Sequence, residues 1–313
     1  MSLRSWIRRQ LRRVGAEFGL GELQKQVIET KLLSAKLLIT RQQSQPVRRL
    51  ADAEFKVFSQ FGDDGIIQYL IRALAVQPDR HTFIEFGVDD YSESNTRFLL
   101  LNDNWRGLIM DGGEENLRSV RQSDLYWRHD LTTVAAFIDR DNINALIGDT
   151  GFKGEVGLLS IDIDGNDYWV WEAIDVVDPL VVIVEYNSIF GALHAITIPY
   201  DPAFRRSRAH FSNLYWGCSL RALCSLSERK GYAFAGCNSA GNNAYFVRHD
   251  KARALALPSV EEGFVESRFR ESRDSQGRLS YLDGRQGLEL IRDLPVFHLG
   301  KNRILAIGQL DEL

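Results

Sequence analysis

The strongest constraint on the fold is an alternation of short β-rich runs with helix-like segments, which begins near residue 55. This pattern is typical of a parallel sheet covered by helices on both faces. The segment 219–232 is predicted to be a helix that ends at Gly231, and residues 232–248 predict an antiparallel hairpin around a turn rich in glycine and asparagine. We therefore expect an α/β fold with a mostly parallel seven-stranded sheet and a terminal hairpin. Its first five strands are predicted at 82–87, 107–111, near 125–128, 156–162 and 181–186.

Residues 1–45 are expected to form a helical extension, because apolar residues recur there at helical spacing. Five arginines and no acid lie in the first 13 residues, although the whole chain has a net charge of −4. Such a helix can lie on an anionic membrane, pair with a second copy of the chain in a homo-oligomer, or pack on its own domain. We expect three parts: the basic extension (1–45), the sheet domain (46–250) and a C-terminal extension (251–313).

Charge and cysteine content exclude several classes of protein. A net charge of −4 does not favour a nucleic-acid-binding surface. The three cysteines form no CxxC pair and no secretory leader is recognisable, so a disulfide framework is not expected. No run of 18 apolar residues is present that could span a membrane. These features predict a cytoplasmic protein, which the basic extension could hold at the inner face of the membrane.

The first two predicted strands both end in an acid. The first ends in FIEFGVDD, with Glu85 and Gly87 at its carboxyl end, and the second ends with Asp111 and two glycines. Ligands of open α/β sheets bind beyond the carboxyl ends of the strands, where a glycine lets the backbone approach. An acid at about the separation of Asp111 from Glu85 accepts hydrogen bonds from the ribose hydroxyls of a nucleoside cofactor. A plain strand-to-helix turn is the alternative interpretation.

Acids also follow the two central strands. The segment GLLSIDIDGND (157–167) places Asp162 and Asp164 after the fourth strand, and the fifth run ends with Glu185 and Asn187. Carboxylates this close together repel one another unless a cation or a substrate hydroxyl offsets their charge. The four side chains offer the ligand types that Mg²⁺ prefers, and such an ion could orient and acidify a hydroxyl. Capping of the next helix would explain Asp164 but not Glu185 as well.

A long irregular segment, 194–217, follows the fifth strand and is rich in arginine and aromatic residues. Segments of this kind often bind substrates, so we expect the acceptor there. In a reaction without metal, His194, Asp164 or Glu185 would take the proton of the attacked hydroxyl. The residues alone favour neither the metal-dependent nor the metal-free reaction.

Five α/β units, a helix and a terminal hairpin resemble the Rossmann-like fold of class I S-adenosylmethionine-dependent methyltransferases over residues 55–250. The resemblance implies S-adenosylmethionine as cofactor. Asp89 and Tyr91 stand where the family has two further glycines, so the first loop either runs differently or uses side chains in place of bare backbone. The positions implied to bind the cofactor are Glu85, Gly87, Asp111, Asp162 and, beside the adenine amino group, Asp130.

Three motifs together resemble FkbM-type and related methyltransferases, which are encoded among polysaccharide and glycolipid genes: SQFGDDGIIQYL (59–70), DIDGND and EYN. This resemblance implies O-methylation of a sugar hydroxyl of a glycan, glycolipid or polysaccharide precursor, with Gln60 and Asp63 approaching the cofactor. The tentative Mg²⁺ ligands are then Asp162, Glu185 and Asn187. The alternative is a degenerate methyltransferase fold that serves as a non-catalytic binding or scaffolding subunit in polysaccharide assembly.

Overall fold

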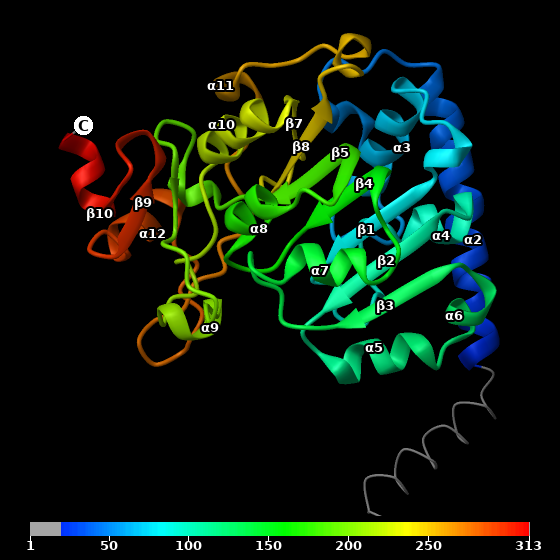
Figure 1. Cartoon of the computed structure of the whole chain (residues 1–313), viewed down its shortest axis with the longest axis horizontal. Helices are drawn as coiled ribbons and strands as arrows, with labels where there is room; N and C mark the ends of the chain where they lie inside the picture. The colour runs from blue at the N-terminus through cyan, green and yellow to red at the C-terminus, as the bar shows by residue number, and fades with distance from the viewer. Residues whose placement is uncertain (1–19, 313) are drawn as a thin grey trace, which may run out of the picture. The chain divides into compact units, whose positions relative to one another are not determined.

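The computed structural model describes residues 20–312 and divides after Pro46 into two compact units (Figure 1). The described part of the first unit is helix α2 (Leu20–Gln43), which contains Gly21 without a break. The part of the predicted basic extension that precedes Leu20 lies outside the described residues. Within residues 20–312, no helix combines the length and apolar character needed to cross a bilayer.

The second unit is built on a seven-stranded sheet of order β3-β2-β1-β4-β5-β8-β7 (Figure 1). Strands β1 to β5 run parallel, β8 pairs antiparallel with β5, and β7 pairs antiparallel with β8. The predicted mostly parallel sheet with a terminal hairpin is therefore confirmed. The strands are β1 (Thr82–Phe86), β2 (Arg106–Asp111), β3 (Leu131–Ala135), β4 (Gly154–Ile161), β5 (Val177–Glu185), β7 (Tyr232–Cys237) and β8 (Asn243–Arg248).

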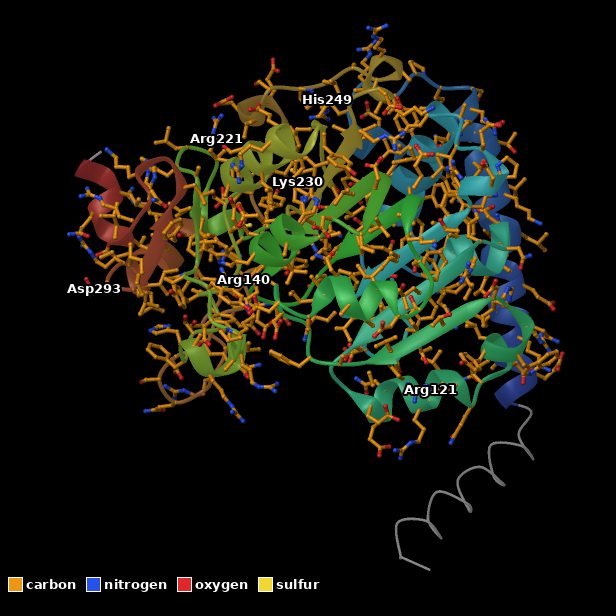
Figure 2. The ribbon with its side chains drawn as sticks, in the orientation of Figure 1. Arg121, Arg140, Arg221, Lys230, His249 and Asp293 are labelled. Carbon is orange, nitrogen blue, oxygen red and sulfur yellow. The ribbon has the colours of Figure 1, made fainter. Side chains whose placement is uncertain are left out.

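Both faces of the sheet are buried. Phe83, Leu158 and Val181 belong to one apolar cluster, whereas the next residue of each strand belongs to a second cluster. This alternation follows from the two-residue period of a strand, and it places helices on both faces. Lys230, which is labelled in Figure 2, donates to the carbonyls of Glu172 and Ile174 and so ties two of these helices together. The helices are α3 (Asp63–Ala73), α4 (Arg97–Asp103), α5 (Glu114–Arg121), α6 (Asp124–Arg128), α7 (Ile143–Gly148), α8 (Asp167–Ala173) and α10 (Leu220–Lys230).

The third strand was predicted in the wrong place. Residues 125–128 lie in helix α6, where Leu125 is buried and Trp127 is 72% exposed, and β3 begins only at Leu131. The aromatic side chains favoured a strand locally, but the parallel register joins Gly107 of β2 to Leu131. Asp130 therefore precedes β3 and lies at the amino end of the strand, the opposite edge from the one predicted.

The C-terminal extension packs on the segment that follows β5. Strands β9 (Pro295–His298) and β10 (Arg303–Ala306) form a second sheet with β6 (Ile196–Thr197) in the order β10-β9-β6. A third apolar cluster joins Ile196 and Leu214 to Ile291 and Val296. The remaining helices are α9 (Arg206–Ala209), α11 (Val260–Gly263), α12 (Gly284–Leu290) and the 3₁₀ turns η1 (Leu50–Ala53), η2 (Pro78–Arg80), η3 (Ser188–Phe190), η4 (Ala252–Ala254), η5 (Leu299–Lys301) and η6 (Ile307–Glu312).

Candidate active site

A cavity of about 1090 Å³ lies at the carboxyl ends of the central strands, where the strand order reverses between β1 and β4. Open α/β sheets bind ligands at this position. We call it the first cavity. The structure brings to its lining most of the site residues that the sequence predicted: Gln60, Glu85, Gly87, Asp111, Asp162, Asp164 and Glu185.

Gly87 allows the ends of β1 and β4 to come together. Its φ is 73°, and a Cβ atom on it would lie 1.7 Å from the carbonyl oxygen of Asp162. Asp89 and Tyr91, which stand at the glycine positions of the resembled family, also have left-handed backbones, with φ of 47° and 60°. The loop therefore keeps a glycine-like backbone conformation, although two of its residues carry side chains and are strained in it.

Glu85 organises this loop from below. One carboxylate oxygen accepts the Asn95 N–H at 2.8 Å, and the other accepts the hydroxyls of Ser94 and Thr96, both at 2.5 Å. Burial raises the pKa of Glu85, and these hydrogen bonds oppose that effect. Because the bonds come from the loop that follows β1, Glu85 mainly shapes the cavity wall.

Asp111 ends β2 and shapes the wall opposite. One of its oxygens accepts the Asp89 N–H at 2.9 Å, and the other accepts the Gly113 N–H at 2.6 Å. The carboxylate is only partly buried, so it also faces the cavity. Asp111 can therefore meet the hydroxyls of a bound nucleoside while holding the two loops around it.

Two acids of the DIDGND segment, Asp167 and Asp164, have different roles. Asp167 is buried and accepts the N–H groups of Ile163 and Gly165, both at 2.9 Å, which closes the turn on itself. Asp164 has a φ of 57°, an unfavourable value that directs its carboxylate outward to the cavity. A Cβ on Gly165 would lie 2.3 Å from the ring of Phe204, so the glycine makes room for the segment after β6.

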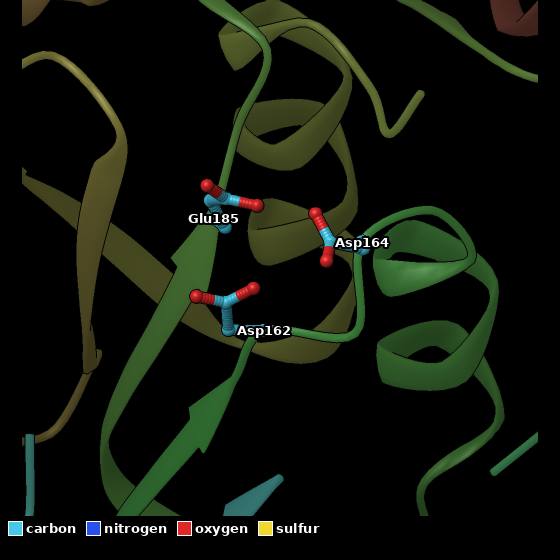
Figure 3. Close-up of side chains that lie close together, drawn as sticks. All are labelled: Asp162, Asp164 and Glu185. Atoms are coloured by element: carbon cyan, nitrogen blue, oxygen red, sulfur yellow. The ribbon is translucent and has the colours of Figure 1, made fainter. Parts of the chain in front are cut away.

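Asp162, Asp164 and Glu185 form a carboxylate cluster, in which one oxygen of each lies within 4.8 Å of the others (Figure 3). Glu185 is 9% exposed, and its Oε2 atom has no hydrogen-bond partner among the described residues. Burial, together with repulsion from neighbouring acids, raises the pKa of both Asp162 and Glu185 well above the usual range. A buried carboxylate oxygen without a partner is costly, and three hard oxygen ligands around one point fit a divalent cation.

Arg206 belongs to this site, although its partner was not predicted from the sequence. Its guanidinium donates to Asp164 at 2.6 Å and lies 4.5 Å from the centre of the Trp216 ring. The only signal in the sequence was the arginine-rich stretch of the irregular segment 194–217. Which arginine meets which acid depends on the packing of α9 against the DIDGND turn.

Two predicted residues, His194 and Asn187, do not line the first cavity. The ring centre of His194 is 6.0 Å from that of His298, beside the second sheet. Asn187 accepts the Ile189 N–H and donates to the carbonyls of Leu214 and Trp216, so its amide braces the segment after β5.

The predicted adenine contact, Asp130, is also distant from the cavity. Its carboxylate is 71% exposed and lies 3.6 Å from Arg106 at the amino edge of the sheet. The cavity wall at the end of β3 is formed by Ala136, Phe137 and Ile138, which are suited to an apolar contact with a flat ring. The adenine assignment to Asp130 is therefore wrong, because it depended on the misplaced third strand.

Gln60 and Asp63 come from one loop but differ in position. Gln60 lines the first cavity, whereas Asp63 is buried beneath it and accepts hydrogen bonds from Asn238, Asn243 and the hydroxyl of Tyr245. Asp63 thus joins the loop before α3 to the β7–β8 hairpin, and Asn242 and Asn243 of that hairpin reach the cavity.

The sheet order and the terminal hairpin define a Rossmann-like fold of the methyltransferase type. No protein-family model and no curated protein sequence matches the chain. Among solved structures, an O-methyltransferase from Bacillus cereus in complex with SAH is 12% identical, with a TM-score of 0.39 over 70% of this chain and 91% of that chain. An S-adenosylmethionine-dependent methyltransferase from Clostridium acetobutylicum is 10% identical, with a TM-score of 0.38 over 59% and 90% of the two chains. At these identities the similarity concerns the fold.

Proposed function

We propose that this protein is an S-adenosylmethionine-dependent O-methyltransferase that acts on a sugar hydroxyl of a glycan, glycolipid or polysaccharide precursor. The observation that carries the proposal is the position of the carboxylate cluster, which lies in the same cavity as Gly87 and Asp111. A cofactor-type loop and a set of oxygen ligands for a reacting hydroxyl thus face one space. The sugar acceptor is supported by the resemblance of the DIDGND, EYN and SQFGDDG motifs to methyltransferases of polysaccharide and glycolipid genes.

The first cavity suits a cationic cofactor. Acids outnumber the two arginines in its lining: Glu85, Asp89, Asp90, Glu93, Asp111, Asp162, Asp164 and Glu185 against Arg205 and Arg206. This field favours the positive sulfonium of S-adenosylmethionine and disfavours the pyrophosphate of a dinucleotide. In the proposal, Asp111 holds the ribose hydroxyls and the backbone of the Gly87 loop approaches the cofactor.

S-adenosylmethionine, when bound, supplies a methyl group that leaves a sulfonium as the sulfur becomes a neutral thioether. The chain must position the acceptor oxygen and remove its proton. Glu185 is suited to both tasks, because it lines the cavity, its Oε2 atom has no partner among the described residues, and burial next to other acids raises its pKa, which makes it a stronger base than an ordinary carboxylate. Asp162 and Asp164 would complete the oxygen set for a divalent cation such as Mg²⁺, which would acidify the hydroxyl.

Calorimetric titration of the purified chain with S-adenosylhomocysteine tests the proposal. We expect saturable binding with a stoichiometry of one, and transfer of a labelled methyl group from S-adenosylmethionine to an extracted glycan fraction. Absence of binding to either nucleoside would refute the proposal and favour the non-catalytic scaffolding subunit. Titration with buffer that lacks the nucleoside, and titration of a heat-denatured sample, are the controls for non-specific heat.

A further inference from the structure

A second cavity of about 280 Å³ adjoins the first one. Both cavities are lined by Gln60, Glu185, Arg206 and Asn242, so they share a wall that includes one member of the carboxylate cluster, Glu185. Glu185, whose buried Oε2 atom has no hydrogen-bond partner among the described residues, belongs to this shared wall. A molecule in the second cavity would therefore lie next to the proposed reacting end of the cofactor.

One wall of the second cavity comes from the C-terminal extension, specifically from residues 266–267, 269–271 and 282–284. This wall is fastened to the sheet domain at two points. The Ser267 N–H donates to the Ser188 hydroxyl at 3.0 Å, and the Arg268 N–H donates to the Ala240 carbonyl at 3.1 Å. Gly241 makes the second contact possible, because a Cβ on it would lie 2.6 Å from the Glu266 backbone.

The side chains of this wall offer an aromatic surface among acids. Phe269 is 42% exposed and its ring centre lies 4.6 Å from that of Phe61. Glu266, Glu271 and Asp283 also line the cavity. Exposed aromatic faces and carboxylates that accept hydrogen bonds suit the apolar face and the hydroxyls of a sugar ring.

The charge of the cavity decides between neutral and anionic sugars. Its lining has four acids and two arginines, and one of these, Arg206, is paired with Asp164 at 2.6 Å. Arg206 is therefore poorly available to an anion. The remaining arginine of the lining, Arg270, is outnumbered by Glu266, Glu271 and Asp283, so a ligand carboxylate or sulfate would meet a mainly acidic wall. Like charges in such a partly desolvated space repel strongly.

We infer that the second cavity is the acceptor subsite and that it takes a neutral sugar ring, with Phe269 as its stacking surface. The inference rests on the proposed methyltransferase function, because that function places the methyl donor in the first cavity. It also assigns a role to the C-terminal extension, which closes the acceptor site against the β7–β8 hairpin.

Saturation-transfer NMR with protein loaded with S-adenosylhomocysteine tests this inference. The probes are the methyl glycosides of mannose, galactose and rhamnose, and their acidic counterparts are the methyl glycosides of glucuronic and galacturonic acid. We expect signals from at least one neutral glycoside, with binding at least tenfold tighter than that of either uronide. Tighter binding of a uronide, or no binding of any neutral glycoside, would overturn the inference.

Two variants and a control locate the binding. Phe269→Ala should weaken neutral glycoside binding at least fivefold and leave S-adenosylhomocysteine binding unchanged. Gly241→Ala should have the same effect through displacement of residues 266–267. Trp127→Ala is the control: it removes a more exposed aromatic side chain from α6 and should not change the binding of either ligand. Equal glycoside binding by the wild type and Phe269→Ala would overturn the assignment of the second cavity as the acceptor subsite. Failure of the wild type to bind S-adenosylhomocysteine would instead overturn the proposed function.

Discussion

Gly87 and Asp162 are in such close contact that no side chain can lie between them: a Cβ on Gly87 would be 1.7 Å from the Asp162 carbonyl oxygen. This approach joins the loop after β1 to the start of the DIDGND turn. It therefore couples the proposed cofactor loop to the carboxylate cluster. The φ of Gly87, 73°, is a left-handed value that glycine adopts without strain, so the backbone conformation also favours glycine here.

Gly87→Ala should lose more stability than left-handed strain alone explains. Gly151→Ala is the matched control, because Gly151 has a φ of 82° but no atom within 4 Å of its Cβ position. Strain of this kind costs about 1–2 kcal/mol, and the collision at Gly87 should add at least about 2 kcal/mol. Urea unfolding measures both variants, and equal losses would show that the strands can separate without cost.

Asp111→Ala should weaken S-adenosylhomocysteine binding at least tenfold. The substitution removes a charged acceptor from the cavity and releases the N–H groups of Asp89 and Gly113, and hydrogen bonds to a charged group contribute about 1.5–3 kcal/mol each.

Asp164→Ala, in contrast to Asp111→Ala, should keep nucleoside binding and lose methyl transfer. Calorimetry distinguishes the two, with Asp130→Ala as the control at the opposite edge of the sheet. The reverse pattern would mean that the roles of the two acids are exchanged.

Strand ends were predictable from the sequence, because apolar runs followed by acids specify both a buried strand and its exposed end. This logic located β1, β2, β4 and β5, and with them the acids Glu85, Asp111, Asp162 and Glu185. It failed at residues 125–128, where aromatic residues on one exposed helix imitate a strand. The error moved Asp130 to the wrong edge, because register is set by pairing with β2 and not by local propensity.

The use of each polar side chain was less predictable. Asn187 has the chemistry of a ligand, yet its amide is occupied by three backbone groups. Arg206 meets Asp164 across 42 positions of the chain. Both outcomes depend on how the segment after β5 folds back over the sheet, and no local pattern encodes that path.

Divalent cations should stabilise the protein through the carboxylate cluster. At a cation concentration about 100 times the dissociation constant, the gain in unfolding free energy would be about 2.7 kcal/mol. Asp162→Asn should abolish the rise in melting temperature caused by Mg²⁺ or Mn²⁺. Asp89→Asn changes an acid of the same cavity outside the cluster and should preserve the rise. A rise of equal size in the Asp162 variant would place the cation elsewhere.

Arg206→Met should strengthen cation binding, since Arg206 occupies the Asp164 carboxylate at 2.6 Å. Methionine keeps an apolar contact with Trp216 and removes the competing positive charge. Titration calorimetry with Mn²⁺ measures the change. Weaker binding in this variant would indicate that the arginine positions Asp164 for the cation instead of competing with it.

Asp167 should make the native state less stable as the pH rises through the weakly acidic range. Burial raises its pKa from 3.8 to about 6, so the folded state binds the proton more tightly than the unfolded state does. This contribution is complete below pH 3.8 and is lost as the pH rises through about 6, by about 3 kcal/mol in total. The side chain of the Asp167→Asn variant cannot ionise. Its amide also directs an N–H group toward the N–H group of Ile163 or Gly165, which the carboxyl oxygens accept in the wild type. The variant should therefore be less stable than the wild type at low pH. The difference between the two proteins, measured by urea unfolding at pH 4 to 7, should shrink as the pH rises, and a constant difference would contradict the raised pKa.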